Sequence, residues 1–322
     1  MPARSFTRGL HDLGNGCWAW LQPDGGWGWS NAGLVADSGE SLLIDTLFDV
    51  RLTREMLEAM RASVPAARRI ATLVNTHANG DHCYGNQLLA GTRIVASRAS
   101  AAEMDELPPE AMARTMKNAA AFGPGGRFLA EVFAPFDFEG IVHTPPTETF
   151  DGELRVRVGN KEVVLFEVGP AHTKGDVIAW VPQDRVVFTG DILFIGGTPI
   201  VWAGPVGNWI AACEKIAGLG ADVVVPGHGP LTDARGALDV RDYLVHVRDR
   251  ARACYDAGLP PEKAAREVEL GRFASLGDSE RIAVNVHTLY REWSGGAHGV
   301  ANALELFGLM SELRRSGARL GG

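Results

Sequence analysis

The sequence predicts an α/β protein in which strand-rich stretches give way to helices twice along the chain. Short apolar runs of strand length alternate with segments of helical spacing, a pattern typical of sheets covered by helices. Histidine and aspartate residues follow directly after several of these runs. At 322 residues the chain suits one core with additions better than two large domains.

The first half begins with strands and continues into a helix. The runs CWAWLQ, GWGWSNAGLVAD and SLLIDT read as strands because Gly- and Asp-containing turns separate them. Residues 50–63 have helical spacing through Leu52, Met56 and Met60. A buried strand, RRIATLVNT, then leads to a helix over DHCYGNQLLAG, a strand TRIVAS and less regular helical pieces over residues 101–146.

The second half repeats the order of strands followed by helices. Strands are predicted over TETFDGELRVRVGNKEVVLFEVG, DVIAWVP, RVVFTGD and ADVVVPGHG, with a helix around NWIAACEKIAGLG before the last of them. From about Thr232 the pattern is helical, with helices expected over residues 239–258, 261–268, 279–293 and 299–315. We therefore predict a first domain over residues 1–235 and a helical C-terminal extension over residues 236–322.

Composition and charge narrow the class of function. The net charge of −8 and the scattered, short Arg clusters disfavour nucleic acid and anionic membranes as partners. No run approaches the roughly 18 apolar residues of a membrane span, and no secretory signal is evident. The four cysteines show no paired spacing. We expect a cytoplasmic protein that acts on a small molecule, with homo-oligomer formation left open.

Four segments carry residues of metal-ligand type. Each lies just past an apolar run and beside a Gly, where loops at one edge of a sheet present side chains to a common cleft. Imidazole and carboxylate groups suit zinc, iron or manganese, and a carboxylate can bridge two cations. The residues are His77, Asp81 and His82 in THANGDH, His172 in GPAHTKGD, Asp191 in FTGD and His228 in PGHG.

These motifs, with LLIDT before them, resemble the metallo-β-lactamase-fold hydrolases over about Gly16 to Leu231. The resemblance implies a four-layer αβ/βα sandwich and makes residues 1–235 the catalytic domain. It also implies one or two bound ions, zinc by expectation, with iron or manganese compatible. The implied ligands are His77, Asn79 and His172 for the first ion, Asp81, His82 and His228 for the second, and Asp191 as the bridge.

Two positions depart from the family pattern. Asn79 stands where the HxHxDH motif has its second His, and an amide oxygen is a weaker and harder ligand than imidazole. Asn79 either coordinates, or bonds a water on the ion, or leaves the first site empty. Lys174 stands where many relatives have Pro. It is either a substrate-binding cation or a solvated loop lysine.

Other residues have two interpretations each. Asp45 either braces the metal loop or ends a strand, and Cys83 is either an activated thiol or a buried structural one. His143 either lines the pocket or lies at the surface. The tryptophans at positions 27, 29 and 202 either wall an apolar pocket or pack in the core.

The leading hypothesis is a metal-dependent hydrolase. A metal-bound hydroxide would attack an ester, thioester, lactone or lactam carbonyl, and Asp81 would orient the water and move its proton. A non-haem iron oxygenase or redox enzyme is the first alternative, because His77, His172 and Asp191 form a set of two His and one carboxylate. A metal-poor binding or regulatory protein is the second alternative. The C-terminal helices are expected to add a surface for substrate or partner rather than ligands.

Overall fold

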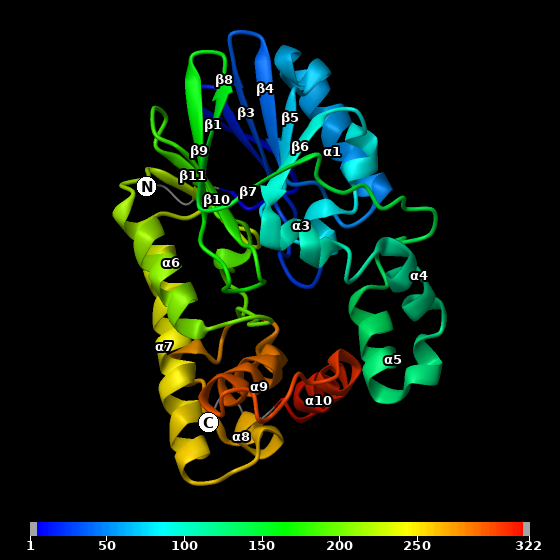
Figure 1. Cartoon of the computed structure of the whole chain (residues 1–322), viewed down its shortest axis with the longest axis vertical. Coiled ribbons are helices and arrows are strands. Elements are labelled where there is room, and N and C mark those ends of the chain that lie inside the picture. Colours follow the sequence, from blue (N-terminus) through cyan, green and yellow to red (C-terminus); the bar gives the residue numbers. More distant parts are fainter. Residues whose placement is uncertain (1–4, 318–322) are drawn as a thin grey trace.

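The computed structural model describes residues 5–317, which form two β-sheets packed face to face (Figure 1). In the first sheet the strands lie side by side in chain order, antiparallel from β1 to β4 and parallel from β4 to β7. They are β1 (Gly9–Gly14), β2 (Cys17–Leu21), β3 (Ala32–Asp37), β4 (Glu40–Ile44), β5 (Thr72–Val74), β6 (Arg93–Ser97) and β7 (Glu148–Phe150).

The second sheet has the order β12-β11-β10-β9-β8, and its strands are antiparallel except for the β11–β12 pair. Its strands are β8 (Glu153–Val158), β9 (Lys161–Glu167), β10 (Val177–Val181), β11 (Val186–Phe188) and β12 (Val223–Val225). The strands predicted from the apolar runs of the second half are therefore confirmed.

Alternation along the strands defines the layers. In β4, Leu42 and Ile44 belong to the buried cluster between the two sheets, whereas Leu43 belongs to the larger cluster under the helices. In β10, Val177 and Ala179 likewise face the other sheet. Successive side chains point to opposite faces of a sheet, so both faces of these strands are covered. Helices outside each sheet complete the predicted four-layer αβ/βα sandwich, which is confirmed (Figure 1).

The helices follow the predicted amphipathic segments closely in the second half of the chain. Asp49 caps α1 by accepting a hydrogen bond from Leu52 N at 2.6 Å. The helices are α1 (Val50–Ser63), α2 (Gly80–Cys83), α3 (Arg98–Met104), α4 (Pro109–Lys117), α5 (Gly123–Val132), α6 (Val206–Gly218), α7 (Ala234–Asp256), α8 (Pro261–Glu267), α9 (Ile282–Trp293) and α10 (Ala303–Ser316).

Three local predictions were wrong. Residues 26–30 form a loop rather than the start of a strand, because Gly25 and Gly28 adopt positive φ values of 82° and 73°. The helix after His77 is only the short α2, and a 3₁₀ turn over Asn86–Leu89 follows it. Strand β1 was not predicted, because it lies at the sheet edge with half-exposed side chains and no apolar alternation.

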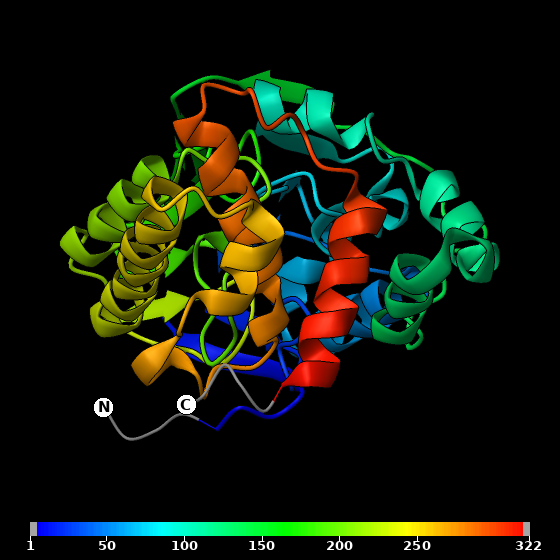
Figure 2. The ribbon, with the colours of Figure 1, turned by 90° about the horizontal axis from the view of Figure 1, so that it is seen from below.

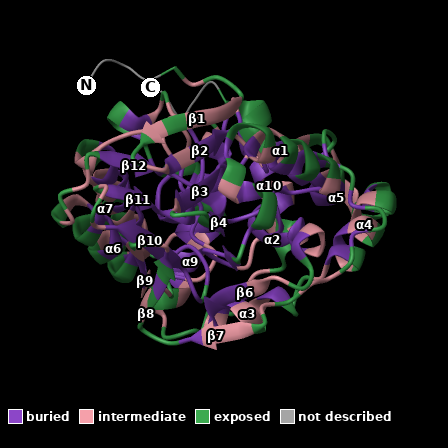
Figure 3. Ribbon diagram, turned by 90° about the horizontal axis from the view of Figure 1, so that it is seen from above, coloured by how far each residue is buried: buried purple, intermediate pink, exposed green. Residues whose placement is uncertain are grey.

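The C-terminal helices pack against the rest of the chain through one buried apolar cluster that reaches from Trp20 to Leu313. The division into domains at residue 235 stays a prediction. Seen from below, α10 crosses in front of the strands between α5 and the other C-terminal helices (Figure 2). The strands of both sheets are mostly buried, and exposed residues gather on the outer helices (Figure 3). Within residues 5–317, none of the helices has the length and apolarity that a membrane crossing requires.

Candidate metal centre

Four loops meet at one end of the sandwich and bring the predicted metal ligands together. They follow β5, β9, β11 and β12, and each starts where an apolar strand stops. Close backbone approach explains the Gly beside each ligand: a Cβ on Gly227 would collide with Asp191 Oδ1. The six ligand candidates are all buried: His77, Asp81, His82, His172, Asp191 and His228.

The four imidazoles share one orientation rule. Each Nδ1 bonds an oxygen outside the group, an arrangement that favours a proton on Nδ1 and leaves Nε2 as the ring atom that can bind a cation. Acceptors of this kind fix both the tautomer and the ring plane. The Nδ1 acceptors are Thr76 Oγ1 for His77 at 3.0 Å, Asp45 Oδ2 for His82 at 2.9 Å, Ile200 O for His172 at 2.7 Å, and Gly25 O for His228 at 3.2 Å.

The four Nε2 atoms surround the carboxylate of Asp191. Its Oδ2 lies 3.3 Å from His228 Nε2, 3.4 Å from His172 Nε2 and 3.7 Å from His77 Nε2. Its Oδ1 lies 3.0 Å from His82 Nε2. Asp81 Oδ2 is 3.2 Å from His228 Nε2 and 3.8 Å from His82 Nε2. A carboxylate among four imidazoles is where a bridging ligand would have to lie.

Several of the ligand atoms have no hydrogen-bond partner, which is what a site for a divalent cation requires. Within the described part of the chain, His77 Nε2, His82 Nε2 and Asp191 Oδ1 are buried atoms without a hydrogen-bond partner. His82 Nε2 and Asp191 Oδ1 are close but are not aligned as a hydrogen bond. Buried polar atoms without partners are costly unless an ion satisfies them. Two compact donor groups result: His77, His82 and Asp191, and Asp81, His82 and His228.

The electrostatics of the group are dominated by burial and by charges in mutual contact. Burial opposes ionisation of Asp191, but the imidazoles of His228, His82 and His77 outweigh it and hold the pKa of the carboxyl well below its usual value. Burial lowers the pKa of His77, and its His neighbours lower it further. These two shifts favour a carboxylate and a neutral imidazole, the states that coordinate a metal. At two other imidazoles burial is outweighed by the neighbouring carboxylates, which raise the pKa of His82 and, to about 9, that of His228, so a cation must displace protons there.

Asn79 faces the same group from the N-terminal end of α2. Its side-chain amide lies 3.1 Å from His172 Nε2, and its residue is half-buried. With the proton of His172 on Nδ1, the amide nitrogen is the atom that faces Nε2, and coordination through the amide oxygen would require the amide to turn over. The sequence prediction that Asn79 faces the cleft agrees with this position, and its role as a ligand stays a prediction.

A shared carboxylate braces the loop that carries three of the ligands. Besides His82, Asp45 accepts hydrogen bonds from Thr76 N and Thr76 Oγ1, each at 2.7 Å. Asp45 is 2% exposed and has a φ of 61°, an uncommon backbone conformation that its hydrogen bonds hold in place. The bracing contact expected for Asp45 is therefore present.

Three other candidates, Lys174, His143 and Cys83, either pair with another side chain or have an unreactive thiol. Lys174 Nζ contacts both carboxylate oxygens of Glu106 at 2.6 Å, and both side chains are at least half exposed. A substrate-binding role for Lys174 stays a prediction. His143 pairs with Asp105 at 2.9 Å near the surface. Burial raises the pKa of the Cys83 thiol, which favours the structural interpretation.

Sequence reasoning missed several residues that shape the site. Phe194 stacks on His228 with ring centroids 5.0 Å apart and planes 4° apart, and Trp209 meets His172 edge-on at 5.6 Å. Asp176 is buried and accepts hydrogen bonds from Ala171 N and from Thr173 N and Oγ1, which holds the loop of His172. The Asp in GPAHTKGD, four residues after the His, is a signal that could have been noticed.

Comparison with known proteins places these observations in a family. Residues 25–228 match the family model described as the metallo-beta-lactamase superfamily. The chain is 24% identical over 256 residues to a linear primary-alkylsulfatase of Pseudomonas sp. (strain ATCC 19151), which covers 71% of this chain and 48% of the relative. It is 24% identical over 224 residues to a metallo-beta-lactamase type 2 of Bacillus cereus, covering 67% and 71%.

Solved structures show the same fold at low identity. A metallo-beta-lactamase from Pontibacter korlensis has a TM-score of 0.57 at 19% identity and covers 73% of this chain and 98% of its own. A stereoselective inverting sec-alkylsulfatase from Pseudomonas sp. has a TM-score of 0.64 at 18% identity and covers 91% of this chain and 51% of its own. This chain spans about half the length of both alkylsulfatases.

Proposed function

Because this chain belongs to the metallo-beta-lactamase superfamily, we propose that it is a zinc-dependent hydrolase of an ester, thioester, lactone or lactam. The observation that carries the proposal is the set of four imidazoles whose Nδ1 atoms bond outward while their Nε2 atoms surround Asp191. Side chains bonded in this way are fixed before the ion arrives, so little ordering is needed on binding. Degenerate sites do not require such a set of acceptors.

The residues that would hold the ions are those that the resemblance implies. His77 and His172, with Asn79, would hold one ion, and Asp81, His82 and His228 would hold the other, with Asp191 shared between them. A divalent cation there would polarise the scissile carbonyl and lower the pKa of water.

Asp81 is suited to move a proton between water and the leaving group. Its side chain is 11% exposed, more than that of any His in the group, so its carboxylate lies nearest to solvent. Ser30 Oγ donates a 2.5 Å hydrogen bond to Asp81 O and fixes the backbone below that carboxylate. Asp81 would accept the proton that water loses on attack and return it to the departing oxygen, sulfur or nitrogen, so that water and substrate become an acid and an alcohol, thiol or amine.

Hydrolysis of an alkyl sulfate is the second candidate. Its support is the coverage: the sec-alkylsulfatase structure covers 91% of this chain, against 73% for the metallo-beta-lactamase from Pontibacter korlensis, and the linear primary-alkylsulfatase covers 71%. The structural likeness to the sec-alkylsulfatase shows only a shared fold. A sulfate ester is therefore proposed as a substrate, and assays must compare its hydrolysis with that of carboxylic esters.

The test combines metal analysis with a substrate panel. Protein purified without a metal-binding tag should contain zinc and hydrolyse at least one of p-nitrophenyl acetate, a thioester, a lactone, a lactam or p-nitrophenyl sulfate. Asp81→Ala and His228→Ala should lose metal and turnover together, while His143→Ala, a surface His outside the group, should keep both. Stoichiometric iron with oxygen consumption would favour the redox alternative, and full metal content with normal rates in both ligand variants would contradict the assignment.

A further inference from the structure

The ring of Phe307 on α10 lies between two tryptophans. The centroid of the Phe307 ring is 5.6 Å from the ring of Trp27 and 6.3 Å from that of Trp202, and it is stacked on Trp202 with 25° between planes. Two rings of α5 and the turn after it complete the enclosure: Phe128 at 6.1 Å and Phe133 at 6.5 Å. Phe307 is 6% exposed, whereas both tryptophans are half-buried.

Both tryptophans belong to loops that hold metal-ligand candidates. Trp202 N donates a hydrogen bond to His172 O at 3.0 Å. Trp27 follows Gly25, whose carbonyl bonds His228 Nδ1. On the same side, the Arg281 guanidinium lies 4.3 Å from the Trp27 ring and 5.4 Å from the Phe194 ring, which itself stacks on His228. Backbone hydrogen bonds therefore tie both loops to ligand candidates: Trp202 to His172 directly, and the loop of Trp27 to His228 through Gly25.

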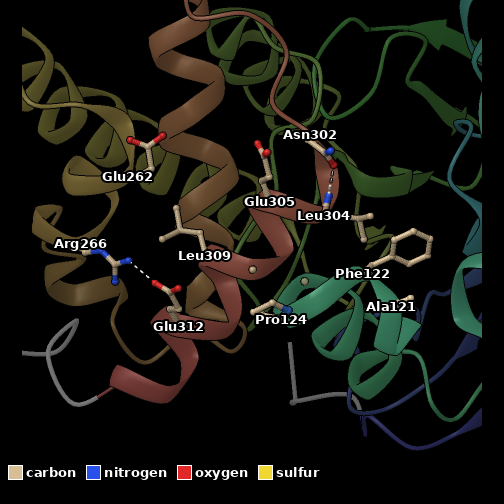
Figure 4. A pocket seen from close by; sticks show the side chains of 12 residues that line it. Ala121, Phe122, Pro124, Glu262, Arg266, Asn302, Leu304, Glu305, Leu309 and Glu312 are labelled. Atoms are coloured by element: carbon tan, nitrogen blue, oxygen red, sulfur yellow. Dashed lines mark hydrogen bonds and ion pairs between the residues drawn. The ribbon is translucent and has the colours of Figure 1, made fainter. Parts of the chain in front are cut away.

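Helix α10 carries Phe307 on its inner face and borders open space on its outer face. The outer face lines a groove of about 610 Å³ between α5, α8 and α10, where Glu305, Leu309 and Glu312 project (Figure 4). The segment before α10 contains Gly295, Gly296 and Gly299, all at positive φ, and the exposed Val300. Phe307 thus belongs to a helix from the far end of the chain, which crosses in front of the strands in Figure 2.

We propose that Phe307 is the specificity-determining residue of the metal centre, because it fills the slot between Trp27 and Trp202 and limits the apolar group that a substrate can place there. The inference rests on the proposed hydrolase function and adds its substrate class: carboxylic esters with a short apolar acyl group. A longer chain would need the space that the phenyl ring occupies. Packed interiors do not yield such space without cost.

Removing the ring should open the slot in proportion to its size. A cavity lined by aromatic side chains stays dry and accepts apolar groups. Each methylene that enters it should tighten binding about fourfold, since burying a CH₂ contributes about 0.8 kcal/mol. Three or four methylenes fit the volume that a benzyl group leaves, so the preference of Phe307→Ala for octanoyl over acetyl compounds should exceed that of the native chain by tenfold or more.

The experiment measures binding and turnover separately. Binding of acetate, butanoate, hexanoate and octanoate to the zinc-loaded protein is followed by calorimetry, and kcat/KM is measured for the matching p-nitrophenyl esters. Phe307→Ala and the milder Phe307→Leu should extend the preference to longer chains, and Phe307→Trp should shorten it. Leu309→Ala is the control, because it truncates the same helix on its outer face.

The outcomes distinguish the two proposals. A chain-length profile of carboxylate binding that shifts with residue 307 but not with residue 309 supports the role of Phe307, even where no ester is turned over, and in that case the hydrolase proposal alone fails. Profiles that agree within about twofold between the native chain, Phe307→Leu and Phe307→Trp overturn the inference, whatever the rates of hydrolysis.

Discussion

Replacing Asp45 by Asn exchanges one oxygen for nitrogen in a buried carboxylate that three donors share. The backbone should tolerate the change, because Asn adopts positive φ values such as the 61° of Asp45 readily. One amide oxygen can keep the bond from Thr76 N, but the NH₂ group must then face Thr76 Oγ1 and His82 Nδ1, which both donate at present. His82 can keep a bond to this NH₂ by moving its proton to Nε2, the atom that faces the metal.

The size of the effect follows from that conflict. Loss of the partner that orients a metal-binding imidazole typically lowers metal affinity 10- to 100-fold, or about 1.4 to 2.7 kcal/mol. We expect a loss in this range for zinc in Asp45→Asn, measured by competition with a chromophoric chelator. Asp49→Asn is the matched control, because Asp49 is equally buried but caps α1, where Asn serves as well. Equal zinc affinity in Asp45→Asn and the native chain would refute the reasoning.

Three further outcomes are expected. Titration of the metal-free protein with zinc should show two binding steps of unequal affinity, and Asn79→His should strengthen the weaker step. Two steps of equal affinity that the substitution leaves unchanged would show that Asn79 is an ordinary loop residue. Burial raises the pKa of Asp176 to about 8, so the folded state binds this proton more tightly than the unfolded state does. The free energy of unfolding should therefore fall as the pH rises from about 4 to 8, by at most about 1.4 kcal/mol per pH unit. Asp176→Asn should flatten this fall in urea unfolding of the metal-free protein, and equal slopes would contradict it. Ending the chain after Ala234 should give aggregated protein, because α7 covers buried residues of α6; a soluble, metal-binding product would support independent domains.

Much of the fold could be predicted because its central strands, such as β4, β10 and β12, are buried on both faces. The runs VVLF and VVV are apolar throughout, and His172 and His228 follow them within a few residues, in the loops that reach the cleft. The positions of His77, His172 and His228 follow from this rule alone. Edge strand β1 escaped prediction for the converse reason, since its residues are half-exposed and its sequence, GLHDLG, carries no alternation.

Contacts between distant segments could not be predicted in the same way. The spacing of α10 shows that Phe307 and Met310 face something apolar, but it does not identify Trp27 and Trp202, which lie 280 and 105 residues earlier. The hydrogen bonds that the imidazole Nδ1 atoms make could not be predicted either. Two of them go to the backbone carbonyls of Gly25 and Ile200, and any residue type has such a carbonyl. Sequence therefore identifies ligands better than it identifies what orients them.

The two halves of the centre differ in charge as well as in ligand type, and this bears on which metal they hold. In the proposed assignment, one half combines His82 and His228 with the carboxylate of Asp81, the other combines His77 and His172 with the neutral amide of Asn79, and Asp191 is common to both. A cation in the half that contains Asp81 is therefore neutralised by one more negative charge than a cation in the half that contains Asn79. In a buried group, where Coulomb interactions are only weakly screened, that difference favours the Asp81 half for any divalent ion. The amide adds a chemical preference in the same direction, because zinc binds imidazole more readily than amide oxygen. Unequal binding then follows from residues already present in the chain, and Asn79→His would remove the chemical part of the inequality while leaving the charge difference intact.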